Sequence, residues 1–97
     1  MGDVISTHVL DTARGEPARG VRVELFSGAE LIAGRETDDD GRVRDLADVK
    51  AGTYRLVFHP PSPFFSRVEV EVTIEDGRDY HVPLLLSPYQ CTIYRGS

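Results

Sequence analysis

The sequence predicts an all-β fold, specifically a β-sandwich, from three observations. The chain has 97 residues, the length of one small domain. Apolar residues recur at every second position in several segments, and no window of useful length repeats at the helical period. Turn-forming residues separate these segments at short intervals, a pattern typical of a sandwich of seven or eight short strands. We therefore expect residues 1–97 to form one sandwich domain.

The first half of the chain contains four expected strands. In the segment 21–26, Val21, Val23 and Leu25 alternate with more polar residues, which predicts one buried face and one solvated face. The segment 4–10 alternates in the same way. Turns rich in Gly, Pro and Asp separate the strands. The expected strands here are 4–10, 21–26, 31–37 and a short one at 42–46, and the turns between them are 14–17, 27–28 and 40–41.

The second half also contains four expected strands. The segment 68–74 is the clearest, because Val68, Val70, Val72 and Ile74 alternate with Glu and Thr. The other expected strands are 53–59, 79–86 and 90–94, and the turns are 51–52, 60–63, 76–77 and 87–88.

Composition excludes several classes of partner. The formal net charge is −5 and no basic stripe is present, which argues against nucleic acid or an anionic membrane as the main partner. No apolar run is long enough to span a bilayer. Cys91 is the single cysteine and the first residues lack a secretory pattern, so we expect a soluble cytoplasmic protein with a reduced thiol.

Alternation also assigns a face to each histidine. Ile5 and Val9 suit the core, so His8 points to the opposite side of its strand. In the segment 79–86, Tyr80, Val82, Leu84 and Leu86 suit the core, which leaves His81, Pro83 and Leu85 on the outer face. Because this strand is apolar on both sides, we expect its outer face to be covered, most simply by another subunit.

Simpler interpretations of the polar residues stay open at this point. A histidine or arginine on an outer face, such as His8, His59 or Arg42, is ordinarily a surface residue, and Cys91 is best read as a structural thiol. Three histidines could hold zinc, although they lack metal-ligand spacing. The acidic run 38–41 suggests a calcium loop, but Val49 stands where a bidentate carboxylate is required, so a turn is expected there.

Four segments together resemble one family, the 5-hydroxyisourate hydrolases. They are Ser6-Thr7-His8-Val9-Leu10-Asp11-Thr12 with Gly15 and Pro17, Thr37-Asp38-Asp39-Asp40-Gly41-Arg42, Tyr80-His81-Val82-Pro83-Leu84-Leu85-Leu86-Ser87-Pro88-Tyr89, and Tyr94-Arg95-Gly96-Ser97. The resemblance implies a transthyretin-like (prealbumin-like) sandwich of two four-stranded sheets. It also implies a homotetramer, arranged as a dimer of dimers, with active sites in the channel between dimers.

The resemblance further implies an activity in urate degradation. The enzyme would hydrolyse 5-hydroxyisourate to 2-oxo-4-hydroxy-4-carboxy-5-ureidoimidazoline without a metal or other cofactor. His8, Arg42 and His81 would be catalytic, while His8, Arg42, Tyr94 and Ser97 would bind the substrate. Which of the two histidines acts as the general base stays open, and residues added after Ser97 are expected to damage activity.

Two other classes are similar to this chain. The hormone carrier transthyretin resembles it throughout, but has lysine, glutamate, threonine and threonine where this chain has His8, Arg42, His81 and Tyr94. Carboxypeptidase regulatory-like binding modules resemble the segment 11–56, and do not account for residues 80–89 or 94–97. A non-enzymatic ligand carrier or binding module is therefore the alternative to the hydrolase.

The chain departs from the hydrolase pattern in two places. Residues 90–93, Gln-Cys-Thr-Ile, replace a run that is usually Gly-Tyr-Ser-Thr, which bears on the placement of Tyr94. The link of residues 60–66 is shorter than in the family, where it contains a short helix. We expect this chain to lack that helix, with an effect on stability or assembly rather than on catalysis.

Overall fold

The computed structural model describes residues 3–75 and 78–96, and its regular elements are β-strands. The strands are β1 (Asp3–Asp11), β2 (Glu16–Pro17), β3 (Arg22–Ser27), β4 (Glu30–Glu36), β5 (Arg42–Val49), β6 (Gly52–His59), β7 (Val68–Ile74), β8 (Tyr80–Ser87) and β9 (Gln90–Ile93). In the part of the chain described, no helix is long and apolar enough to cross a membrane.

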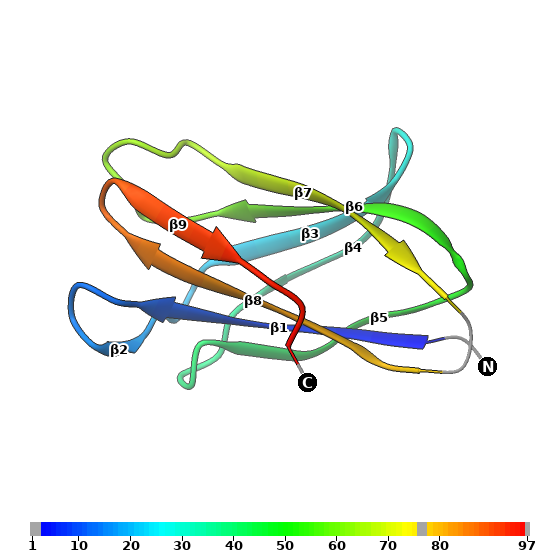
Figure 1. The fold of residues 1–97 in the computed structure, drawn as a ribbon, viewed down its shortest axis with the longest axis horizontal. Helices are drawn as coiled ribbons and strands as arrows, with labels where there is room; N and C mark the ends of the chain where they lie inside the picture. Colours follow the sequence, from blue (N-terminus) through cyan, green and yellow to red (C-terminus); the bar gives the residue numbers. More distant parts are fainter. Residues whose placement is uncertain (1–2, 76–77, 97) are drawn as a thin grey trace.

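The strands form two sheets that face each other (Figure 1). One sheet has the order β4-β3-β6-β7, with every pair antiparallel. In the other sheet β1 is central, with β8 beside it in parallel, β9 beyond β8, and both β2 and β5 on the opposite side of β1. This second sheet carries all of the residues that the sequence suggested as catalytic.

The core lies between the inner faces of the two sheets. Ile5, Val9 and Leu84 from one sheet pack with Leu25 and Phe58 from the other, and none of these five side chains is exposed to solvent. Burying a large aliphatic or aromatic side chain stabilises a fold by about 1.5–3 kcal/mol. The residues at the alternate positions, such as Ser6 and His8 on β1, face outward, as the alternation predicts.

The predicted all-β fold of two sheets is confirmed, and each of the eight expected strands is present. The ends differ by a few residues, most clearly in β5, which continues to Val49 rather than stopping at residue 46. The two-residue strand β2 was not anticipated, because so short a pairing has no periodic signal. It makes this sheet five-stranded rather than four-stranded. The expected turn at 76–77 lies outside the described residues.

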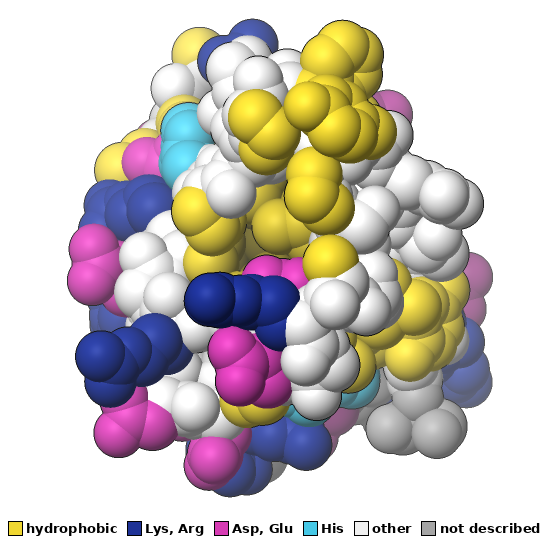
Figure 2. All heavy atoms as spheres, turned by 90° about the vertical axis from the view of Figure 1, so that its left-hand side faces the viewer, with side chains coloured by type: hydrophobic (Ala, Val, Ile, Leu, Met, Phe, Trp, Pro, Cys, Tyr) yellow, Lys and Arg dark blue, Asp and Glu magenta, His cyan; other side chains and the backbone are white. Residues whose placement is uncertain are grey.

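The link between β6 and β7 contains no helix among its residues 60–67, as expected. The Ser62 hydroxyl ties it to the β8–β9 turn by donating to the carbonyl of Pro88 at 2.9 Å. Phe64 packs against Tyr89 with ring centroids 6.1 Å apart, and these rings are 67% and 72% exposed. Figure 2 shows apolar side chains gathered at this end of the molecule.

Candidate active site

Strand pairing brings the three expected catalytic residues to one face of the β1-containing sheet. His8 on β1 stands opposite Arg42 on β5, and Ser6 on β1 stands opposite His81 on β8. Side chains directly opposite in neighbouring strands share a face and lie about 4.5–5.5 Å apart at Cβ. Since β1 is flanked by β5 and β8, His8 lies between Arg42 and the strand that carries His81.

An open hollow of about 480 Å³ occupies this face. Its lining includes Ser6, Arg42 and His81, together with Arg95 and Gly96 from the C-terminal segment. Asp79 and Tyr80 complete the lining residues. A second hollow, of about 190 Å³, is also lined by Ser6, Arg42 and His81. His8 is not among the residues that line either hollow, so of the two histidines His81 has the direct access.

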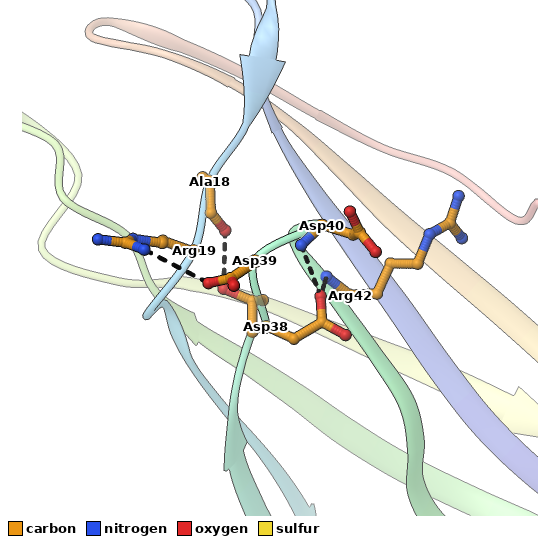
Figure 3. A network of polar contacts seen from close by, with 7 residues as sticks. Ala18, Arg19, Asp38, Asp39, Asp40 and Arg42 are labelled. Atoms are coloured by element: carbon orange, nitrogen blue, oxygen red, sulfur yellow. Dashed lines mark hydrogen bonds and ion pairs between the residues drawn. The ribbon is translucent and has the colours of Figure 1, made fainter.

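A tight turn between β4 and β5 holds Arg42 (Figure 3). One carboxylate oxygen of Asp38 accepts hydrogen bonds from the amides of Asp40 and Arg42, each at 2.9 Å. The bond from the Arg42 amide is the main cause of the lowered pKa of Asp38, which keeps this carboxylate ionised. Gly41 is required at this turn, because its φ is +74° and a Cβ there would lie 2.5 Å from the carbonyl oxygen of Val9.

The Arg42 side chain extends away from this turn toward the neighbouring strands (Figure 3). Within the described part of the chain, its guanidinium takes part in no ion pair, although the residue lines both hollows. A guanidinium offers five N–H donors in a planar fork suited to carboxylates and polarised carbonyls. Arg42 is therefore placed to bind an anionic or carbonyl-rich ligand.

His8 is held by the same turn. Its Nε2 atom lies 3.0 Å from the carbonyl oxygen of Asp40. A carbonyl oxygen only accepts hydrogen bonds, so Nε2 of His8 is the donor and carries a proton. When His8 is neutral, Nδ1 is therefore its unprotonated nitrogen.

His81 contacts Ser6 through Nδ1, which lies 2.9 Å from the serine hydroxyl oxygen. Burial lowers the pKa of His81 below its usual 6.5, and electrostatic interactions with Arg42 and His8 lower it further. His81 is consequently neutral at neutral pH. A neutral imidazole can accept a proton from a water molecule. Because the guanidinium of Arg42 lies at the same hollow, a ligand bound there would lie close to that water.

The C-terminal segment lies beside His81. The amide of Gly96 donates to the carbonyl of His81 at 2.7 Å, in the same register as the β8–β9 pairing. Regular pairing stops after Ile93, where Pro83 stands opposite the continuing chain and has no N–H to offer. The Arg95 guanidinium carbon lies 4.7 Å from the centre of the Tyr80 ring. Gly96 and Arg95 thereby reach the hollow.

Tyr94 lies elsewhere in this chain. It is 49% exposed and lines a separate hollow of about 270 Å³, together with Val70 and Val72 of β7. The structure therefore joins Ser6, Arg42 and His81 in one hollow but does not bring Tyr94 into it. Ser97, the other expected substrate-binding residue, lies outside the described residues.

Sequence reasoning missed Ser6, Arg95 and Gly96 as site residues. Alternation had already placed Ser6 on the outer face with His8, and this shared face could have identified it as a site residue. Its pairing with His81 depends on the register of two strands that are distant in sequence, which alternation does not give. Arg95 and Gly96 were noted only as part of a terminal motif, and no periodicity extends past the end of β9.

The site favours chemistry on a polar or anionic small molecule. Arg42 and Arg95 supply positive charge at one hollow, and His81 supplies a proton acceptor. Among residues 3–75 and 78–96, no group of three or more His, Cys, Asp or Glu side chains is arranged to hold a metal ion. The hollow is lined by two guanidiniums but only one carboxylate, besides an imidazole, a hydroxyl and a phenol, which suits an organic anion better than a cation.

Comparisons with known proteins define the class of this one. Residues 5–96 match the model of the HIUase/Transthyretin family. This span includes 80–89 and 94–96, which a carboxypeptidase regulatory-like module does not account for. The chain, an all-β sandwich with a histidine–arginine site on one sheet, therefore belongs to the HIUase/Transthyretin family.

Relatives within that family are named as enzymes. The chain is 40% identical to 5-hydroxyisourate hydrolase 2 of Rhizobium meliloti, over 96% of this chain and 95% of the relative. It is 39% identical to 5-hydroxyisourate hydrolase of Pseudomonas aeruginosa, over 96% and 90%. The solved structure of Klebsiella pneumoniae 5-hydroxyisourate hydrolase superposes with a TM-score of 0.89 at 31% identity, covering 98% of this chain and 94% of that one.

Proposed function

We propose that this chain is a 5-hydroxyisourate hydrolase, which opens the six-membered ring of its substrate by adding water at a ring carbonyl. The observation that carries this proposal is the shared hollow of Arg42 and His81, in a protein whose relatives bear that name over nearly their full length. A carrier needs neither a neutral imidazole nor an unpaired guanidinium at its binding site.

His81 is the general base in this proposal. It lines the hollow, and its lowered pKa keeps it neutral at working pH. General base catalysis of this kind typically contributes about 10²–10⁴-fold to rate. Nε2 of His81 removes a proton from water as the water oxygen attacks the ring carbonyl carbon.

Arg42 binds the substrate and stabilises the oxyanion that forms on the attacked carbonyl. A single well-placed donor at such an oxyanion is worth about 3–4 kcal/mol of transition-state stabilisation. Arg42 cannot be the base, because its pKa stays above about 12.

The second half of the reaction returns the proton. The tetrahedral intermediate collapses, the bond between the carbonyl carbon and the ring nitrogen breaks, and the departing nitrogen takes the proton from His81. One water molecule is consumed and no electrons are transferred. The residues that carry out these steps are already in the hollow, so the proposal requires no metal or organic cofactor.

His8 assists from beside Arg42. Its Nε2–H is engaged with the Asp40 carbonyl, so Nδ1 is left to orient water or the substrate. We retain Tyr94 and Ser97 as substrate-binding residues on the strength of the family resemblance. Arg95 and Gly96 of the same segment line the hollow, whereas Tyr94 lines the neighbouring one.

The test of this function is direct. Uricase is used to generate 5-hydroxyisourate in the cuvette, and the decay of its absorbance is followed with and without the protein. The proposal predicts decay that is faster in proportion to protein concentration. A rate equal to the spontaneous one, with protein that is folded by circular dichroism, would instead favour a carrier.

We also propose that the protein works as a homotetramer, a dimer of dimers, in the cytoplasm. The exposed rings of Phe64 and Tyr89 and the apolar Leu85 on the outer face of β8 support association with further copies. The single thiol of Cys91 supports a reducing compartment. Light scattering on protein eluted from a size-exclusion column tests the assembly, and a monomer would contradict it. Fractionation of cells tests the location, and protein in the membrane or exported fraction would contradict it.

A further inference from the structure

Ser6 and His81 form a direct side-chain contact at the centre of the site. They are opposite each other in the parallel pairing of β1 with β8, and the hydroxyl oxygen lies 2.9 Å from Nδ1. Both residues are partly buried, and both line the two hollows on this face. The contact therefore joins the Ser6 hydroxyl, which has no role so far, to Nδ1 of His81. In the proposed reaction Nε2, not Nδ1, reacts with water.

The other edge of the His81 ring faces the C-terminal segment. A Cβ on Gly96 would lie 2.7 Å from Cδ2 of the ring, so the chain passes very close to the carbon bonded to Nε2. In the described part of the chain, Nε2 of His81 has no hydrogen-bond partner. Nδ1 is engaged by Ser6, and Gly96 has no side chain that would cover the opposite edge. Nε2 is therefore the ring nitrogen available to a ligand in the hollow.

A neutral imidazole carries its proton on one nitrogen only. To act as a base through Nε2, His81 must carry that proton on Nδ1, and the proton then needs an acceptor. The Ser6 oxygen has two lone pairs and can accept a hydrogen bond from this N–H. The hydroxyl rotates, so a lone pair can point toward Nδ1. The opposite arrangement, with Ser6 donating to Nδ1, would put the proton on Nε2 and remove the basic nitrogen from the hollow.

We propose that Ser6 is a positioning residue that accepts the Nδ1–H of His81 and so keeps Nε2 unprotonated toward the hollow. The inference rests on the proposed function, because it assigns the base of that reaction. The proton balance is complete: Nε2 takes one proton from water, and the imidazolium keeps its Nδ1–H bonded to Ser6. The ring then returns the Nε2 proton to the departing nitrogen.

The kinetic test uses Ser6→Ala, Ser6→Thr and a matched control, Ser27→Ala, which makes the same change at an exposed position at the end of β3 in the other sheet. Ser6→Ala is expected to lower kcat roughly 10- to 100-fold, by analogy with the loss of the hydrogen-bond partner that orients a metal-binding histidine. KM should change much less. Ser6→Thr retains a hydroxyl and should recover most of kcat, while Ser27→Ala should match the unmodified protein.

The spectroscopic test does not depend on activity. Nitrogen-15 NMR of the ring distinguishes a protonated from an unprotonated nitrogen, and the unmodified protein should show Nδ1–H and bare Nε2 at His81. Ser6→Ala should reduce that tautomer. A bare Nδ1 in the unmodified protein, or a Ser6→Ala variant with unchanged kcat and tautomer, would overturn the role of Ser6. An unmodified protein that lacks activity but shows the Nδ1–H tautomer would contradict the function and leave the Ser6 contact standing.

Discussion

Nε2 of His8 lies 3.0 Å from the carbonyl oxygen of Asp40, and this bond ties one expected catalytic residue to the turn that carries another. The same turn begins β5 at Arg42 and is closed by the carboxylate of Asp38. One short loop thus sets the tautomer of His8 and the starting point of the Arg42 side chain. Disturbing this loop should therefore affect the site more than the fold.

Asp38→Ala tests the organising role of the turn. The change removes the acceptor for the amides of Asp40 and Arg42. Since small misplacements of catalytic groups can cost about a hundredfold, we expect kcat/KM to fall roughly 10- to 100-fold. Asp39→Ala is the matched control, because among the described residues that carboxylate contacts only the exposed Arg19, at 3.4 Å. Steady-state kinetics on both variants would contradict the account if they lost activity equally.

Arg42→Ala removes the proposed oxyanion donor. We expect turnover to fall at least about a hundredfold, with the thermal transition nearly unchanged, because the guanidinium has no ion-pair partner in the described structure. Arg42→Lys keeps the charge without the planar fork and should be intermediate. Arg67→Ala, which removes an ion pair with Glu69 of β7 at 3.2 Å, serves as the control. Full activity in Arg42→Ala would exclude the assigned role.

The titration of His81 gives a prediction about pH. Burial, then Arg42 and His8, lower its pKa below 6.5, while Asp79 and Arg95 also line its hollow. The unfolded chain takes up this proton near 6.5 and the folded chain only at lower pH. The contribution of His81 to stability is therefore full above about pH 6.5 and is lost as pH falls toward the folded pKa.

NMR titration of the His81 ring measures this pKa. It should lie below 6.5 in the unmodified protein and move up toward that value in Arg42→Gln, without fully reaching it because burial remains. The acid limb of kcat/KM should follow the same pKa. A His81 pKa at or above 6.5 would show that it is not held neutral in the way described.

Gly96→Ala tests the close approach of the C-terminal segment to the base. The added Cβ would lie 2.7 Å from Cδ2 of His81 and 3.2 Å from Cγ of Pro83. Either the ring or the segment must move, so we expect a clear loss of kcat with little change in melting temperature. Gly96→Val should lose more. Unchanged kinetics and unchanged His81 ring resonances in Gly96→Ala would mean that the C-terminal segment does not affect the position of the His81 ring.

The sequence predicted which face each site residue occupies. The alternation of Ile5 and Val9 with Ser6 and His8 follows from the two-residue period of a strand, and the same holds for His81 between Tyr80 and Val82. Because those apolar residues are buried in the core, the two histidines lie on the outer face of the sheet, as the alternation predicts. Arg42 was identified as a site residue by the family resemblance, because an arginine after an Asp-Gly turn is ordinarily a surface residue.

Neighbours across the sheet could not be predicted in the same way. The pairing of Ser6 with His81 joins residues 75 positions apart in the sequence and depends on β8 lying parallel to β1. The position of Tyr94 depends on where pairing with β8 is interrupted, and that interruption falls at Pro83. Both are properties of strand register, which a single strand's pattern of apolar residues does not encode.

The most direct measurement of the central claim is a double-mutant cycle in the hydroxyisourate decay assay, using His81→Ala, Arg42→Ala and the double variant. If the two residues act on one substrate in one hollow, the double variant should be about as slow as the slower single variant, because residues that act as a unit are not additive. Rate losses that multiply, or an unmodified protein that does not accelerate the decay, would contradict the account.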